Sequence, residues 1–248
     1  MLSIFNVLTY LLRSGKLKVT ELFFKVPLDQ ANPSSGTIRI FARSVTRHDA
    51  PTSPLTEKEA RKQEQKPWLL WLQGGPGSPC APPRSTPFIN LMLDRGYKIL
   101  YMDQRGTGLS TPVSAETLAL RGDVRQQADY LRLFRADSIV NDCEAIRKIL
   151  VKDYPSDLRK WTVFGQSFGG FCAFTYLSKY PESLKEVFTA GGVPPIGHSP
   201  DDVYKATFSQ VSVALNAPLN LFVRMEIQPW PVLDGGELTH KQLDLQKE

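Results

Sequence analysis

A serine flanked by glycines stands where an apolar run meets a helix-like segment. Thr162, Val163 and Phe164 are typical of a buried strand, and residues 168–179 have the apolar spacing of a helix. A sharp turn between two such elements leaves little room for side chains, and the helix N-terminus behind it favours developing negative charge. The pattern predicts a nucleophile elbow with Ser167 at its tip. Its residues are Gly165-Gln166-Ser167-Phe168-Gly169-Gly170.

Acyl transfer by a serine also needs hydrogen-bond donors at the point where the carbonyl oxygen becomes an anion. The backbone N–H of Phe168, the residue after the nucleophile, is one expected donor. We expect the second from the glycine-rich loop at residues 73–77, where Gly75 is the first choice and Gly74 the second. The alternative is that these glycines only form a tight turn after a strand.

Two charged residues, Asp103 and Arg105, follow the next apolar run along the chain. They could act as an acid and an electrophile. Because carboxylates and the forked Arg side chain commonly pin loops, the favoured interpretation is a structural salt bridge or a loop anchor.

The general base is the residue that the sequence does not supply clearly. Only His198 and His240 follow Ser167, in a proline-rich connection and a charged tail respectively, and neither is preceded by a strand that could carry an acid. His48 lies in a charged, proline-containing stretch at residues 46–66 and is expected to be a solvated loop residue.

Strand-like and helix-like segments alternate along the chain. Two alternating segments joined by a turn at residues 32–36 predict an antiparallel hairpin, and the later segments predict a mostly parallel sheet with helices on both faces. The expected strands are residues 19–26, 37–45, 68–72, 97–102, 162–164 and 184–190, and the expected helices are 87–94, 138–152 and 168–179. In such a sheet ligands bind beyond the carboxyl ends of the strands, where the glycine-rich turns should converge.

Length and composition narrow the class of protein further. A chain of 248 residues can bury one large core, and the 30 Lys and Arg against 25 Asp and Glu are scattered, which disfavours nucleic-acid binding. The three cysteines are widely spaced without a CxxC pair, which predicts reduced thiols in a cytoplasmic protein and no metal site. The apolar residues 1–12 are too short to span a bilayer, and no membrane association is expected.

Three motifs in combination resemble the proline iminopeptidases, serine aminopeptidases of the α/β-hydrolase fold that release N-terminal proline. The resemblance runs from about Val19 to Gly192. It implies Ser167 as nucleophile, an oxyanion hole made by Phe168 and the Gly74-Gly75 pair, a small peptide substrate with N-terminal proline, and no cofactor. Gln73 stands where many members have histidine. The motifs are Gln73-Gly74-Gly75-Pro76-Gly77, Asp103-Gln104-Arg105-Gly106-Thr107-Gly108 and the elbow.

The resemblance also implies a division of the chain. We expect an N-terminal extension at residues 1–18, a partial α/β-hydrolase core at 19–195, and a partial helical cap and tail at 196–248, in which residues 201–206 form the first cap helix. Members of the family return to the sheet after the cap for the acid and histidine, so the chain is expected to be truncated within the cap.

Three hypotheses follow from these expectations. The first is a serine aminopeptidase of the proline iminopeptidase type. The second is a non-catalytic truncated α/β-hydrolase fragment or interaction module, and the third is an esterase with a reduced cap. No oligomeric state follows from the sequence.

Overall fold

A computed structural model describes residues 3–13, 16–48, 54–194, 197–199, 201–206, 208 and 209. The chain divides into two compact units, residues 1–194 and 195–248. In the described part of the second unit, residues 201–206 are helical, which is the segment where the resemblance implies a first cap helix. None of the helices among the described residues is long and apolar enough to cross a membrane.

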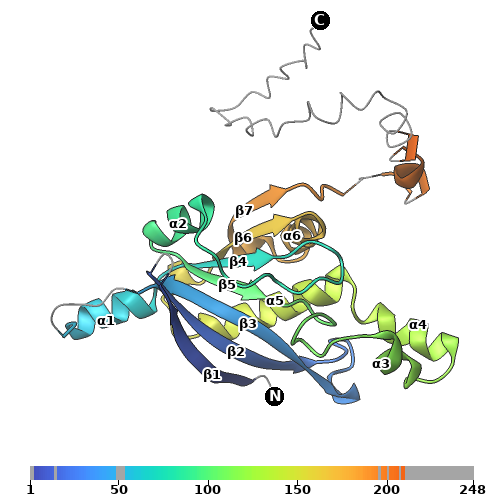
Figure 1. The fold of residues 1–248 in the computed structure, drawn as a ribbon, viewed down its shortest axis with the longest axis horizontal. Coiled ribbons are helices and arrows are strands. Elements are labelled where there is room, and N and C mark those ends of the chain that lie inside the picture. The colour runs from blue at the N-terminus through green and yellow to red at the C-terminus, as the bar shows by residue number, and fades with distance from the viewer. Residues whose placement is uncertain are drawn as a thin grey trace, which may run out of the picture. The chain divides into compact units, whose positions relative to one another are not determined.

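The described residues of the first unit form one seven-stranded sheet with helices beside it (Figure 1). The order across the sheet is β1-β2-β3-β5-β4-β6-β7. The strands are β1 (Ser3–Leu12), β2 (Leu17–Pro27), β3 (Thr37–Arg47), β4 (Trp68–Leu72), β5 (Lys98–Met102), β6 (Trp161–Gln166) and β7 (Leu184–Ala190), and the helices are α1 (Glu57–Glu64), α2 (Pro87–Asp94), α3 (Ala115–Ala119), α4 (Val124–Arg132), α5 (Ala136–Leu150) and α6 (Phe168–Lys179).

The N-terminal half of the sheet is antiparallel. The predicted hairpin is confirmed, with β2 and β3 paired from Leu17 opposite Arg47 to Pro27 opposite Thr37. Residues 3–12, expected to belong to an extension, form β1 and pair antiparallel with β2. Aromatic and β-branched residues in this segment favour a strand, and the pairing with β2 runs to Leu12 opposite Leu17.

The other half of the sheet is parallel, and its strand directions determine where the three motifs lie in the fold. β4 lies between β5 and β6 and runs parallel to both, and β6 runs parallel to β7. Since all four strands point the same way, the residues that follow them gather at one edge of the sheet. The loop after β4, the loop after β5 and the elbow after β6 therefore meet there.

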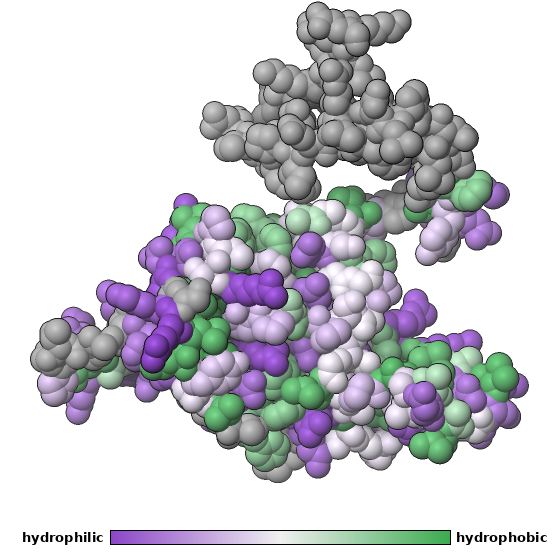
Figure 2. All heavy atoms as spheres, in the orientation of Figure 1, coloured by the Kyte–Doolittle hydropathy of each residue, from purple (hydrophilic) through white to green (hydrophobic). Residues whose placement is uncertain are grey.

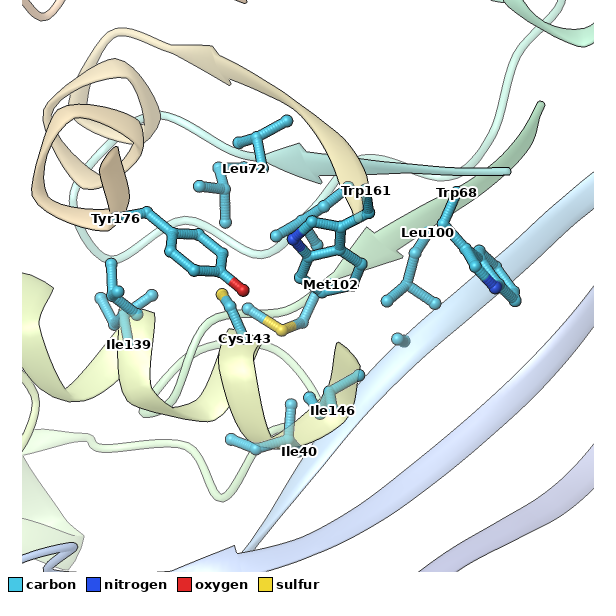
Figure 3. Close-up of a cluster of buried hydrophobic side chains, with 14 of the residues drawn as sticks. Ile40, Trp68, Leu72, Leu100, Met102, Ile139, Cys143, Ile146, Trp161 and Tyr176 are labelled. Carbon is cyan, nitrogen blue, oxygen red and sulfur yellow. The ribbon is translucent and has the colours of Figure 1, made fainter. Parts of the chain in front are cut away.

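Side chains of the parallel strands alternate between two cores, which is why these strands read as continuous apolar runs. Leu70 and Leu72 of β4 face the core formed with α5 and α6, whereas Leu69 faces the core formed with α2. Figure 3 shows the first of these cores, in which Tyr176 of α6 and Trp161 of β6 pack edge to face with ring centroids 6.1 Å apart.

Three helices were not predicted. α1 lies within the charged stretch at residues 46–66 and buries no residue, and a capping box between Thr56 and Glu59 starts it. α3 and α4 also begin with capping boxes. Figure 2 shows purple spheres over α1 and green spheres over the α3–α4 region, where Leu120 and Val124 are exposed. These three helices are short and bury no residue, so they lack the apolar stripe of a helix that faces a core.

Candidate active site

Ser167 occupies a strained turn between β6 and α6. Its φ of 53° and ψ of −120° lie outside the regions that side chains other than glycine usually adopt. The turn is held from two sides, because the amide of Ser167 donates to the carbonyl of Ala190 at the end of β7 (2.9 Å) and its carbonyl accepts from the amide of Gly170 (2.8 Å). The Ser167 residue is exposed, so its hydroxyl is open to a substrate.

Two glycines of the elbow are required by close backbone approach. A β-carbon on Gly165 would collide with the carbonyl of Gly169, and one on Gly169 would collide with the carbonyl of Leu72 at the end of β4. Helix α6 can therefore begin directly against the parallel strands only with glycine at both positions.

The loop after β4 brings Gly74 against the serine. An ideal β-carbon on Gly74 would lie 2.9 Å from the Gln166 carbonyl oxygen and 3.6 Å from Ser167 Oγ. One built on Gly75 meets atoms of its own loop instead, namely the amides of Gly77 (3.0 Å) and Ser78 (3.1 Å). Of the two glycines that the sequence analysis names as donors, Gly74 is the one that lies against Ser167.

Phe168 opens helix α6 immediately after Ser167. Amides in the first turn of a helix have no intrahelical acceptor, so the Phe168 N–H is free to bind a developing oxyanion. The geometry thus gathers a hydroxyl and two backbone segments rich in N–H donors, an arrangement suited to stabilising a tetrahedral acyl intermediate.

Asp103 and Arg105 anchor loops, as the favoured interpretation predicts. Both are buried. Asp103 accepts from the amides of Cys80 (2.8 Å) and Leu109 (2.9 Å). Arg105 forms a bidentate pair with Asp142 of α5, at 2.6 and 2.7 Å. Neither side chain is free to act on a substrate.

Gln104 is the residue of this edge that the sequence reasoning missed. Its side-chain Nε2 donates to the backbone carbonyl of Gln73 at 2.9 Å. A polar residue two positions after β5 was the available signal, because β5 pairs with β4 and Gln73 directly follows β4.

The structure does not bring a predicted histidine to Ser167. Ala42 of β3 pairs with Met102 of β5 and Val45 pairs with Ile99, so the exposed His48 lies beyond the amino ends of the parallel strands, opposite the elbow. His198 is exposed and belongs to the second unit. His240 lies outside the described residues.

A cavity of about 310 Å³ adjoins the loop and the elbow. Its walls combine apolar and polar side chains and include Phe168, Leu131 and Phe134 together with Gln104 and Thr107. An apolar side chain or ring of a substrate would lose water-exposed surface there.

Other chemistry finds little support in the described part of the chain. It contains no group of three His, Cys, Asp or Glu side chains placed to hold a metal ion. Cys172 on α6 is buried, and burial raises the pKa of its thiol to about 12. Cys172 is therefore a core residue and not a second nucleophile, as predicted.

Comparisons with known proteins agree with this geometry. The α/β hydrolase fold family matches residues 67–219. Proline iminopeptidase aneH of Aspergillus aculeatus is 45% identical over 195 residues, covering 79% of this chain and 41% of the relative. Proline iminopeptidase of Aeromonas sobria is 48% identical over 192 residues, covering 77% and 41%. That of Xylella fastidiosa is 30% identical over 126 residues, covering 51% and 32%. The chain spans about two fifths of the length of the first two relatives.

Proposed function

We propose that the protein is a serine aminopeptidase that releases N-terminal proline from small peptides. This chain belongs to the α/β hydrolase fold family, and its curated relatives are proline iminopeptidases. The observation that carries the proposal is the exposed Ser167 in its strained turn with Gly74 against it.

In the proposed reaction Ser167 Oγ attacks the carbonyl carbon of the N-terminal proline. The oxygen that becomes negative is held by the N–H groups of Phe168 and of the loop, with Gly74 favoured over Gly75 by its contact with the elbow. The bond to the following residue breaks, a proton is delivered to the leaving amine, and water releases proline from the acyl-enzyme.

Two further features support an apolar substrate group and a reducing compartment. The cavity beside Phe168 offers apolar walls to a ring the size of proline. Cys80, Cys143 and Cys172 are all buried and unpaired, which is the state typical of cytoplasmic proteins, and we infer that location for this one.

The proposal is tested with a fluorophosphonate probe and proline arylamide on the protein and on Ser167→Ala. With a base that completes the site, we expect labelling and turnover in the protein. Because a serine knockout leaves only binding and oxyanion stabilisation, Ser167→Ala should then lose turnover on the order of a millionfold.

Ser178→Ala is the matched control, since Ser178 lies on the same helix α6, is exposed, and hydrogen-bonds only the carbonyl of Phe174. N-acetylproline arylamide, which lacks the free amino group, should not be hydrolysed. Labelling of Ser167→Ala equal to that of the unaltered protein would contradict the assignment of the nucleophile. No labelling of the unaltered protein would favour the non-catalytic alternative.

A further inference from the structure

We propose that Asp103 and Gln104 are positioning residues that clamp the two ends of the loop at residues 73–80 and so aim the amide of Gly74 at the oxyanion. The inference rests on the proposed function. Gln104 Nε2 donates to the carbonyl of Gln73 at the start of this loop (2.9 Å), and Asp103 Oδ1 accepts from the amide of Cys80 at its end (2.8 Å).

The contact of Gln104 decides the direction of one peptide plane. Among the described residues only the Gly75–Pro76 bond is cis, so the Gln73–Gly74 peptide is trans, and its C=O and N–H point in opposite directions. Holding the Gln73 carbonyl on Gln104 turns the Gly74 N–H away from Gln104. A rotation of this plane would move the donor and leave the fold intact.

The same carbonyl also lies over the elbow. The Gln73 oxygen is 3.0 Å from the position of a β-carbon on Gly169 in the first turn of α6. The Gln73 carbonyl oxygen therefore contacts Gln104 and also lies close to the first turn of α6. Its position and the position of Ser167 are coupled.

Asp103 and Gln104 are themselves rigidly held. The Gln104 carbonyl accepts from the amide of Thr107 (3.0 Å) and from its hydroxyl (2.8 Å), and the Asp103 carbonyl accepts from Ser110 Oγ (2.6 Å). The Asp103 and Gln104 residues are only 3% and 2% exposed. A buried side chain on a hydrogen-bonded turn can hold its hydrogen-bond partner in one position, whereas an exposed side chain would adopt several rotamers.

The test compares Gln104→Met, which keeps the length of the side chain and removes the donor, with the unaltered protein. We expect the second-order rate of fluorophosphonate labelling to fall roughly 10- to 100-fold, as for a misplaced oxyanion donor. The kcat for proline arylamide should fall by a similar factor with KM little changed, and the midpoint of the pH–rate profile should stay in place, because the base is not touched.

A second measurement needs no activity. In hydrogen–deuterium exchange, peptides covering residues 73–80 should exchange faster in Gln104→Met, while peptides covering β6 and α6 keep their protection. Thr162→Val is the matched control, since Thr162 is buried on β6 and bonds Tyr97 and Glu186, away from the loop. It should leave both the labelling rate and the exchange of residues 73–80 unchanged.

The outcomes separate the two proposals. If the unaltered protein is labelled and Gln104→Met is labelled at the same rate, the positioning role is overturned and the proposed function stands. If the unaltered protein is not labelled, the proposed function fails, and the exchange data decide alone: unchanged exchange of residues 73–80 in Gln104→Met overturns the clamp, and faster exchange confined to this loop supports it.

Discussion

The backbone of Ser167 has a strained conformation at the residue that the sequence predicts as the nucleophile. A non-glycine residue at φ 53° persists only when its surroundings hold it, and here β7 and the first turn of α6 do so through the Ser167 amide and carbonyl. Such strain typically costs about 1–3 kcal/mol. The fold bears this cost at the residue that we propose as the nucleophile.

At the residue scale, Gly74→Ala should disable the elbow without unfolding the protein. The added methyl would lie 2.9 Å from the Gln166 oxygen and 3.0 Å from Ser167 Cβ, so the loop or the elbow must shift. We expect the fluorophosphonate labelling rate to fall roughly 100-fold, as for a displaced oxyanion donor.

Gly77→Ala is the control for Gly74→Ala. Its methyl would meet no atom within 4 Å, although the φ of +94° disfavours alanine by about 1 kcal/mol. Gly77→Ala should therefore lower the melting temperature and keep most of the labelling rate. Equal labelling rates in the two variants would show that contact with the elbow is not what matters at residue 74.

A second residue-scale prediction concerns Lys98 at the start of β5. Its Nζ donates to Tyr154 Oη (2.6 Å) and the Glu64 carbonyl (2.7 Å) and lies 4.3 Å from the centroid of the Trp68 ring. Burial lowers the pKa of Lys98 to about 8 from 10.5. Below pH 8 the Lys98 amine is protonated in both the folded and the unfolded chain, and the folded state bears the cost of burying its charge. As the pH rises from 8 toward 10.5, the folded chain loses this proton before the unfolded chain does, so the cost disappears.

Lys98→Met removes this titration. The unfolding free energy of the unaltered protein minus that of Lys98→Met should therefore rise between pH 8 and 10.5, measured by urea denaturation at each pH. Taking the difference cancels the other groups that titrate in this range. A difference that stays constant over the range would contradict the lowered pKa.

At the scale of elements, Arg105 joins segments that are distant in the sequence. Its guanidinium pairs with Asp142 of α5 and also donates to the carbonyls of Pro27 at the end of β2, Leu28 and Leu133. One planar, forked side chain thus connects the hairpin, the loop after β5 and the helix that covers the sheet. The turn that carries Gln104 depends on the same connection.

Arg105→Lys should destabilise this junction strongly. A lysine keeps the charge but cannot reproduce the fork, so buried carbonyls and part of the Asp142 carboxylate lose their donors. We expect a loss of about 2–4 kcal/mol in the free energy of unfolding, by urea denaturation.

The comparison variant is Arg132→Lys on α4. Arg132 pairs with Asp129 at 3.3 Å, with side chains 75% and 58% exposed. Exposed pairs contribute little, so this variant should change stability by less than about 0.5 kcal/mol. Similar losses in both variants would mean that the geometry of Arg105 adds nothing beyond its charge.

At the scale of the whole molecule, the reactivity of the buried thiols should report cooperative unfolding. Cys80 contacts the α2 core, whereas Cys143 and Cys172 lie in the α5–α6 core. Burial raises the pKa of Cys80 and of Cys172 to about 12, and that of Cys143 well above its ordinary value. Ellman's reagent at about pH 8 should react with these thiols only as fast as the protein unfolds, and rapidly in guanidinium chloride.

The same groups contribute to the loss of stability at alkaline pH. Their folded pKa values lie above the ordinary 9.0, so the contribution of the neutral thiols is complete below pH 9 and is lost as pH rises toward 12. Replacing Cys80 or Cys172 with alanine should reduce this alkaline loss, measured by denaturation above pH 9. Fast reaction of the native protein with Ellman's reagent would contradict the burial of the thiols.

Much of the fold and the elbow could be predicted from the sequence, because their signals are local. The strands at residues 68–72 and 184–190 and the helices at 87–94 and 168–179 have the predicted bounds, since apolar runs and helical spacing follow from neighbours along the chain. The glycines around Ser167 are likewise within a few residues of it. The surface helices lacked such signals, and the strand-favouring residues at 3–12 were expected to belong to an N-terminal extension.

Only the tertiary structure decided which residues meet at the edge of the sheet. That Gly74 rather than Gly75 contacts Ser167, that Gln104 holds Gln73, and that Arg105 is committed to Asp142 all depend on β4 lying between β5 and β6. Pairing of distant strands is non-local, so the identity of a residue and its sequence neighbours do not determine its contacts. The sequence determined the nucleophile that we propose, and the packing of the parallel strands decided what surrounds it.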